Sequence, residues 1–554
     1  MGSSFKRFID GLKSLSQKHP FAAISAVTGF ALLLVLLRAS ILNYQYLFGM
    51  YHDDGVYLVS AQSLLDGHGY RILSLPTEPF QTKYPVGYPL VLSSAMLIMP
   101  AFPANLIGLE TMQTVLSVAA VLVTVGYLLS TKKVTPLLGL AIAFTCLLNM
   151  RFIDFAPMLM SDLPAALLVS ACMWCAESQS RQQDSFSPWV GLLLAAAITT
   201  RTQALILVPT LLIYYAVRKR TRSAITMLAI ALVCVVPQMW WQTRTSQGTP
   251  EILTFYTNYL KHAYGTLPSS SAGFAAAAGN FDWSMFVQIN TYFPGLEQIP
   301  YQLLSPIAFF LLYKVVYYLL AVPSLTGMFI LLKRASLPAL FCFFYGFSFS
   351  LWPIKLEWRH ILPVLVFGYY FYFVGFRFFA AKLKRAISAR KQTSAGQYSK
   401  FCIGATVVFS CYLVIGAGVL SCAKAGWLKA LSQPPEPGIA VDFQEAVSWI
   451  KANTTADAVF VCNNDPVFYL YTHRHAIMPS RMELWRFVAD KYVDAKSLSA
   501  AIEFSKATYV MNEPALRSSG YAYTQLNKAI AEEGTFIPVF KTKNNLIEIF
   551  KVSR

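Results

Sequence analysis

Residues 111–129 read TMQTVLSVAAVLVTVGYLL, an apolar run without Asp, Glu, Lys or Arg. A helix of roughly 20 such residues crosses the ~30 Å hydrocarbon core of a bilayer. Similar runs occur at 21–37 and 401–420. The chain of 554 residues is 56% hydrophobic and only 13% charged, whereas soluble domains carry about 25% charged residues. The sequence therefore predicts a polytopic membrane protein and excludes a soluble fold.

The net charge of +18 is distributed as in a membrane protein. Much of it lies in short basic clusters between apolar runs, at 132–133, 218–222, 333–334 and 382–400. Such clusters are typical of cytoplasmic loops, because Lys and Arg are enriched on the cytoplasmic side of membranes. We therefore interpret the positive charge as a sign of sidedness and exclude a nucleic-acid-binding function.

Sidedness can be followed backwards from the basic cluster at 382–400. If that cluster is cytoplasmic, the spans 361–380 and 401–420 place the tail from about 425 outside. The segments 38–84 and 243–300 then also lie outside. The stretch 85–104 does not fit a simple crossing, since it is short and has prolines at both ends. A re-entrant or interfacial helix resolves this, as does a misjudged span elsewhere.

Two domains are predicted. Residues 1–424 form an all-α membrane domain of about 11–13 helices. Residues 425–554 form a small external α/β domain, because a helical pattern at 443–453 is followed by strand-like runs. These runs lie at 458–462, 507–511 and 536–552. We interpret His473-Arg474-His475 in this domain as an exposed turn.

The first external segment carries two adjacent carboxylates, Asp53 and Asp54, followed by Tyr57. Adjacent carboxylates repel each other, so a cation, a proton or a basic group normally offsets them. One of them can accept a proton from a hydroxyl nucleophile, or both can hold a divalent metal through their oxygens. The alternative is a solvated acid pair at a helix start, where acids favour the first turn.

Three further segments bring polar residues to the same face. Lys83 and Tyr84 stand in a Pro/Gly-rich turn, where a lysine suits a lipid phosphate or, alternatively, anchors the chain at the interface. Asp162 lies at the start of a helix, where it is either a functional acid or an ordinary N-cap. Arg201 interrupts an apolar run, and an arginine at that depth is a functional candidate.

The fifth polar segment precedes the span 361–380 and contains Glu357, Arg359 and His360. Each of the five segments has an ordinary structural explanation. Their convergence on one face of the membrane favours a functional site over five unrelated features.

In this order, the motifs resemble those of GT-C fold glycosyltransferases over roughly residues 45–380. Asp53-Asp54-x-x-Tyr57, with Leu64-Leu65-Asp66-Gly67 after it, is similar to their first external loop. Lys83-Tyr84-Pro85-Val86-Gly87-Tyr88-Pro89 resembles the element K-(Y)-P-P-G-Y-P, with Val86 in place of the second proline. Ser161-Asp162-Leu163-Pro164, Thr200-Arg201 and Arg359-His360-Ile361-Leu362-Pro363 resemble later elements. The most similar branch contains protein O-mannosyltransferases and lipid A aminoarabinose transferases.

The resemblance implies an inverting glycosyltransferase of the cell envelope, in a bacterial inner (plasma) membrane with its active site facing the periplasm. It implies transfer of a hexose or pentose from a polyprenyl-phosphate donor to a glycan, lipid or protein acceptor on the outer face. Asp53 is then the general base or a carboxylate that orients the acceptor, and Asp54 a metal or substrate contact. Lys83, Arg201 and Arg359 neutralise the phosphate, since a leaving phosphate needs fixed cations. The other expected substrate contacts are Tyr57, Tyr84, Asp162, Glu357 and His360, and a divalent metal stays open.

Two other function classes compete with this hypothesis. A transporter or flippase of a lipid-linked glycan predicts a polar path across the bilayer and an internal repeat. The polar residues here gather on one face and no repeat is visible. A sensor predicts that deletion of residues 425–554 removes all function.

Overall fold

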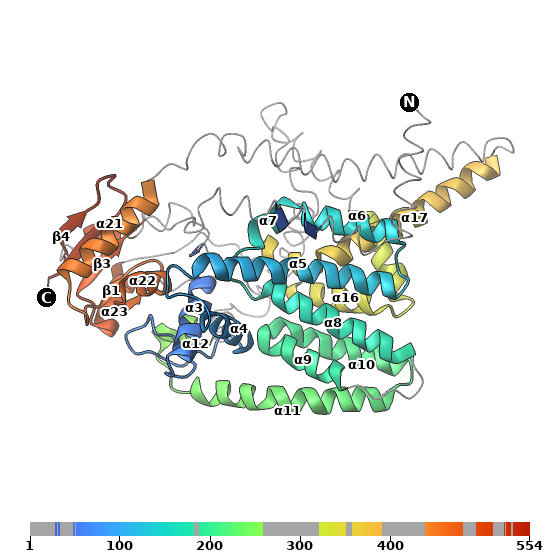
Figure 1. Ribbon diagram of the computed structural model, residues 1–554, viewed down its shortest axis with the longest axis horizontal. Helices are drawn as coiled ribbons and strands as arrows, with labels where there is room; N and C mark the ends of the chain where they lie inside the picture. The colour runs from blue at the N-terminus through green and yellow to red at the C-terminus, as the bar shows by residue number, and fades with distance from the viewer. Residues whose placement is uncertain are drawn as a thin grey trace.

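The computed structural model of the protein has two regions (Figure 1). Helices form a membrane region, and a small α/β domain holds the C-terminal part of the chain. The predicted span 401–420, the boundary near 424, most of the run 21–37 and most of the segment 243–300 lie outside the described residues. The structure describes residues 28–29, 32–33, 48–49, 51–181, 188–258, 321–350, 357–390, 438–479, 495–513, 526, 528–532 and 536–553.

Three described helices are long and apolar enough to cross a membrane, namely Leu106–Ser130, Thr221–Thr245 and Trp358–Lys382. A fourth crossing is available if the bent pair Ala321–Leu332 and Leu337–Phe349 is one span broken by 120°. The prediction of a polytopic helical membrane protein is therefore confirmed. The expected 11–13 helices refer to the whole chain, so this count over the described residues does not test them.

The bundle is built around α5 (Leu106–Ser130) and α8 (Asp162–Arg181), which pack side by side. Next come α9 (Trp189–Thr200) against α8, and α11 (Thr221–Thr245) against α9. The other helices are α3 (His52–Leu65), α4 (Gly87–Met96), α6 (Pro136–Leu147), α7 (Met150–Phe155), η2 (Thr202–Ile206), α10 (Leu207–Val217), η3 (Glu251–Leu253), α12 (Thr254–Thr257), α16 (Leu337–Ser350), η6 (Trp358–His360), η7 (Leu362–Val364) and α17 (Leu365–Arg390).

One face of α11 remains uncovered by protein. Its large apolar side chains stay exposed, among them Val233 at 75% and Ile225 at 68%. In a soluble protein so many exposed apolar groups on one helix would be costly, whereas lipid tails are as apolar as these side chains. The exposed stripe therefore fits a lipid-facing helix.

The stretch 85–104 contains only the short helix α4, which has 10 residues. This is well below the roughly 20 residues needed to cross the hydrocarbon core. Pro85 and Pro89 flank the helix start, where a missing N–H costs nothing. The structure thus places here a short helix packed on α3 and α9, instead of a membrane crossing.

The C-terminal domain has a five-stranded sheet in the order β2-β1-β3-β5-β4. β1 (Phe460–Val461) pairs in parallel with β2 (Ala476–Ile477) and β3 (Tyr509–Asn512). β5 (Glu548–Val552) pairs antiparallel with β3 and with β4 (Phe536–Lys541). The helices α21 (Gly438–Asn453), α22 (Asp465–Thr472) and α23 (Ala495–Ser505) complete the predicted α/β domain.

This domain lies at one end of the bundle, next to α3, α4 and α12 (Figure 1). Its helix α22 packs directly on α3. At the predicted exposed turn, His473 is exposed and ends α22 in a left-handed conformation with φ of 55°, whereas Arg474 and His475 are half-buried. The candidate site therefore lies where the membrane helices and the C-terminal domain meet.

Candidate active site

The two adjacent carboxylates at the start of α3 point in different directions. Asp54 folds back onto the start of its own helix, where its oxygens accept the backbone N–H groups of Gly49 at 3.0 Å and Gly55 at 2.6 Å. Its side chain is 1% exposed. Burial raises the pKa of Asp54 to about 8, although these hydrogen bonds oppose the rise. Asp54 is therefore a largely neutral capping group at pH 7, turned away from the other polar segments.

Asp53 faces the predicted cationic segments. Its Oδ1 accepts the hydroxyl of Tyr84 and lies 3.9 Å from Nζ of Lys83. Its Oδ2 accepts from the guanidinium of Arg359 at 3.2 Å. Burial disfavours the carboxylate, but the two cations and the Tyr84 hydroxyl outweigh burial and hold the pKa of Asp53 well below its usual range. The structure thus brings together an ionised carboxylate and two cations from three distant segments.

Lys83 is held between aromatic rings. Its ammonium lies 4.1 Å from the ring centroid of Phe255 and 4.8 Å from that of Tyr84. The side chain is only 5% exposed. Burial lowers the pKa of Lys83 to about 8, and the nearby Asp53 carboxylate limits that fall. Lys83 is therefore a cation with little hydration, which binds an anion more strongly than a solvated lysine does.

The turn that carries Lys83 is fixed by hydrogen bonds between side chains and its backbone groups. Oε1 of Gln81 accepts the N–H groups of Lys83 at 3.0 Å and Tyr84 at 3.3 Å. The carbonyl of Tyr84 in turn accepts from Tyr70 and Gln242. The Pro/Gly-rich turn is thus a rigid support for both Lys83 and Tyr84.

Arg359 comes from η6, immediately before the long helix α17. Its Nε lies 2.8 Å from a carboxylate oxygen of Glu357, and its guanidinium carbon lies 4.6 Å from the ring centroid of Tyr51. Glu357 orients Arg359 toward Asp53. His360 instead accepts the backbone N–H of Glu357 and packs against Phe349, so it shapes the turn.

A second cluster lies around Arg201, at the break between α9 and η2. The guanidinium pairs with Asp162 at 2.8 Å and donates to Oγ of Ser161 at 3.0 Å. The same Oγ is 2.8 Å from the hydroxyl of Tyr57. Asp162 is fully buried, so this ion pair and its hydrogen bonds are well shielded from water.

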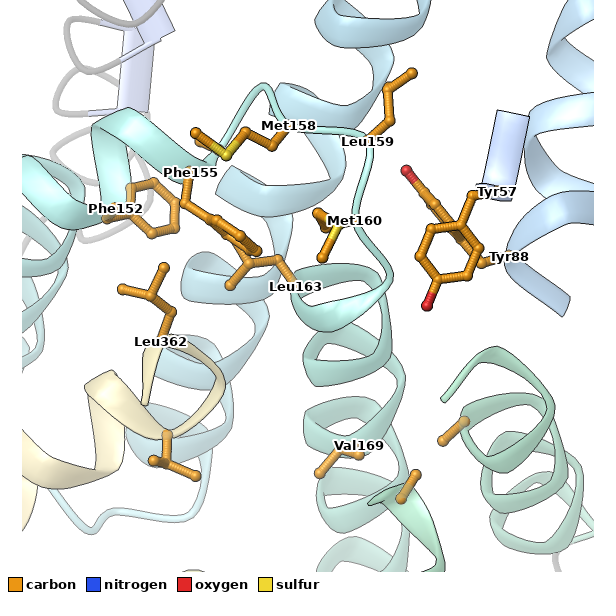
Figure 2. Packing of buried hydrophobic residues seen from close by; sticks show 14 of the residues in the cluster. Tyr57, Tyr88, Phe152, Phe155, Met158, Leu159, Met160, Leu163, Val169 and Leu362 are labelled. Carbon is orange, nitrogen blue, oxygen red and sulfur yellow. The ribbon is translucent and has the colours of Figure 1, made fainter. Parts of the chain in front are cut away.

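Tyrosine side chains in ring contact join the two clusters. Tyr57, which bonds to the Arg201 cluster, lies 4.8 Å from the ring of Tyr84, which bonds to Asp53. Tyr57 also meets Tyr88 edge-on, with the ring centroids 5.1 Å apart. Figure 2 shows Tyr57 and Tyr88 beside the Met158–Met160 loop that leads into α8. The two clusters are therefore neighbouring parts of one polar site with an aromatic wall.

The donor set does not fit a divalent metal. Oxygen-rich sites for Mg²⁺ or Ca²⁺ need several carboxylate, carbonyl or water ligands around one point. Asp53 instead meets cations and a hydroxyl donor, and Asp54 meets backbone N–H groups. Over the described part of the chain, no group of three His, Cys, Asp or Glu residues converges. We therefore derive no chemical step through a metal.

Most of the predicted site residues come together in the structure. The Asp53 cluster unites Asp53, Lys83, Tyr84, Glu357 and Arg359, and the Arg201 cluster unites Tyr57, Asp162 and Arg201.

Sequence reasoning missed Tyr51, Phe255 and the linking role of Ser161. Ser161 was visible as a polar residue before Asp162, whereas Phe255 is one of 40 phenylalanines and gave no signal.

No protein-family model and no curated protein matches this chain. In structure, the chain is similar to the apo oligosaccharyltransferase of Archaeoglobus fulgidus. The TM-score is 0.54 at 13% identity, over 96% of this chain and 74% of that chain. The A. fulgidus oligosaccharyltransferase AglB, in complex with an inhibitory peptide and a dolichol-phosphate, gives a TM-score of 0.53 at 11% identity over the same shares. ArnT of Cupriavidus metallidurans bound to undecaprenyl phosphate gives 0.49 at 12% identity, over 95% and 98%.

The likeness to the two oligosaccharyltransferase structures extends over nearly the whole chain. It shows that the membrane region and the C-terminal domain together have the GT-C fold, which the sequence motifs predicted. Fold alone does not define a reaction, because one fold can host unrelated functions.

Proposed function

We propose that this chain is an inverting glycosyltransferase that moves a sugar from a polyprenyl-phosphate donor to an acceptor hydroxyl or amine. The observation that carries the proposal is the Asp53 cluster, where one carboxylate meets Lys83 and Arg359. Transfer from a polyprenyl-phosphate sugar needs cations for the phosphate and a carboxylate for the incoming acceptor. In this cluster the carboxylate of Asp53 lies 3.9 Å from Lys83 and 3.2 Å from Arg359.

The cations suit the phosphate leaving group. When the bond between the sugar and the phosphate breaks, negative charge develops on the phosphate oxygens. Lys83 and Arg359 reach the same small volume next to Asp53, and Arg201 borders it through Tyr57 and Tyr84. A fixed guanidinium can bind two phosphate oxygens, whereas the lysine acts as a point charge. We assign the donor phosphate to the space between these three cations.

Donor binding also activates Asp53. In the free protein, its ion pairs hold the pKa of Asp53 low, so the carboxylate is a weak base. The donor phosphodiester, which carries one negative charge, competes for the same two cations and weakens their hold on Asp53. The base strength of Asp53 then rises only when the donor is present, because the charges that lowered its pKa have been redirected. Asp53 can then accept a proton from the acceptor hydroxyl.

The proposal also covers the type of donor, the active face of the membrane, the acceptor and the transferred sugar. The likeness to an oligosaccharyltransferase bound to a dolichol-phosphate supports a lipid-linked donor. The positions of the basic clusters support an active face on the outer side of a bacterial inner membrane. The acceptor is a glycan, lipid or protein, and the transferred sugar is a hexose or pentose.

The direct test is donor-phosphate binding by the purified full chain in nanodiscs. Undecaprenyl phosphate is the probe, and its affinity is compared between the wild type and the variants Lys83→Gln and Arg359→Gln. We expect each variant to weaken binding at least about tenfold, since a hydrogen bond to a charged group contributes roughly 1.5–3 kcal/mol. Lys132→Gln, which removes an exposed lysine elsewhere, is the matched control.

Unchanged affinity in both variants would remove the proposed donor site. A second assay separates transfer from transport. Proteoliposomes with polyprenyl-phosphate sugars and a set of envelope acceptors are followed for a new glycosidic bond. Movement of intact donor between leaflets without bond formation would favour the flippase alternative.

A further inference from the structure

A fully buried carboxylate of the C-terminal domain lies at the base of the candidate site. Asp465, the first residue of α22, is 0% exposed. Its Oδ1 is 2.9 Å from Nε2 of His52 and accepts the hydroxyl of Tyr256 at 2.8 Å. Its Oδ2 accepts the hydroxyl of Ser74 at 2.7 Å. One carboxylate of the C-terminal domain therefore binds three separate segments of the preceding chain.

One of these partners is the direct neighbour of Asp53, and another is the direct neighbour of a residue that packs on Lys83. His52 precedes Asp53 in the first turn of α3. Tyr256 follows Phe255, whose ring lies 4.1 Å from the ammonium of Lys83. Asp465 is thus connected to the proposed base on one side and to the proposed phosphate ligand on the other.

The helix α22, which begins with Asp465, packs closely on the start of α3. A Cβ atom on Gly55 would lie 2.9 Å from Cγ of Pro466, and one on Gly49 would lie 2.9 Å from a methyl group of Val467. Asn464 also donates to the carbonyl of Gly49 at 2.9 Å. Figure 1 shows α22 beside α3. The first turn of α3 therefore rests on α22, with glycines at the contact points.

We propose that Asp465 is a positioning residue that fixes Asp53 through His52 and Lys83 through Tyr256 and Phe255. This inference rests on the proposed function for its catalytic consequence. It makes the C-terminal domain an integral part of the active centre, because the carboxylate bonds to both α3 and α12, where the rings of His52 and Tyr256 also pack on each other. A buried charge that loses its partners is costly, so the network holds its members in one arrangement.

The chain offers a matched control for this residue. Asp442 is also a fully buried carboxylate of the C-terminal domain, and it accepts hydrogen bonds from Thr542, Asn544 and Leu546. All of these partners belong to the same domain. Asp442→Asn therefore perturbs the domain alone, whereas Asp465→Asn perturbs its connection to α3.

The experiment uses the full chain in nanodiscs with two readouts. The first is hydrogen–deuterium exchange of the backbone amides of residues 55–60 in α3. The second is the affinity for undecaprenyl phosphate. We expect Asp465→Asn to speed exchange in α3 at least about tenfold, equivalent to about 1.4 kcal/mol of local opening, and to weaken binding severalfold. Asp442→Asn should leave both readouts at their wild-type values.

A further variant separates positioning from general destabilisation. If Asp465 acts through His52, His52→Gln should also speed exchange in α3, and the effect of the double variant should be smaller than the sum of the two single effects. Unchanged α3 exchange in Asp465→Asn, an equal effect of Asp442→Asn, or fully additive effects would each overturn the proposal. If the wild type fails to bind undecaprenyl phosphate, the proposed function falls, while the exchange readout still decides whether Asp465 positions α3.

Discussion

The guanidinium of Arg359 lies 3.2 Å from the carboxylate of Asp53, although 306 positions separate these residues in the chain. The contact joins the start of α3 to η6, the short helix ahead of η7 and α17. It leaves Asp53 ionised and Arg359 directed at the same volume as Lys83. The pair therefore defines where a phosphate and an acceptor would meet, and the predictions below depend on it.

Asp53→Asn should abolish sugar transfer while Asp54→Asn preserves most of it. General base catalysis is worth typically 10²–10⁴-fold, so a loss of at least about 100-fold is expected for Asp53→Asn. Asp54 caps α3, and its pKa of about 8 leaves it largely neutral at pH 7, as an amide would be. Initial rates of transfer in proteoliposomes measure both variants. Equal losses in the two variants would contradict the assignment of Asp53 as the base.

Donor binding should weaken as the pH rises above about 8. Below this pH Lys83 is protonated and attracts the phosphate, and above it the amine becomes neutral. The phosphate is fully ionised over this range, so the loss comes from the protein. We expect the Kd for undecaprenyl phosphate to rise by up to about tenfold per pH unit above 8, since one proton is involved.

Lys83→Arg is the control for this pH dependence. Arginine keeps its charge throughout the range, so the variant should show a flat Kd between pH 7.5 and 9.5 even if its affinity is lower. The effect of rising pH on the free energy of unfolding has the opposite sign to its effect on donor binding. Because burial holds the pKa of Lys83 below its ordinary value of 10.5, its contribution to stability rises with pH between about 8 and 10.5. A pH slope that persists in the arginine variant would contradict the role of Lys83.

Much of this arrangement could be predicted from the sequence, for identifiable reasons. Lys83 and Arg201 stood out because charge is rare in an apolar chain. The different fates of Asp53 and Asp54 could not be predicted, because adjacent residues of a helix start differ only in direction and both were plausible ligands. Asp465 gave no signal at all, since a charged residue in a polar domain looks solvated until its partners are known.

Asp162→Asn should destabilise the chain more than the double variant Asp162→Asn with Arg201→Gln. Asp162 is fully buried and pairs with Arg201 at 2.8 Å. Removing one partner of a buried ion pair typically costs about 3–5 kcal/mol because the other charge loses its compensation, whereas neutral partners restore part of it. Thermal unfolding of the purified variants gives the comparison. A double variant less stable than Asp162→Asn alone would show that Arg201 has other strong partners.

Gly87→Ala should destabilise the membrane region, since glycine is required where α4 meets α9. A Cβ atom on Gly87 would lie 2.6 Å from the backbone carbonyl oxygen of Thr199, and neither backbone segment can move freely. Overpacking of this kind costs typically 1–3 kcal/mol. Because Lys83 and Arg201 flank this contact in sequence, weaker binding of undecaprenyl phosphate should accompany the loss of stability.

Gly346→Ala in α16 provides the comparison, because nothing lies within 4 Å of a Cβ atom there. Alanine stabilises a helix interior by up to about 1 kcal/mol relative to glycine, so this variant should keep or slightly raise the midpoint of thermal unfolding. The two variants are measured in the same nanodiscs, by thermal unfolding and by probe affinity. If Gly87→Ala unfolds at the same temperature as Gly346→Ala and binds the probe equally well, the close contact between α4 and α9 is not what holds the Lys83 turn beside Arg201.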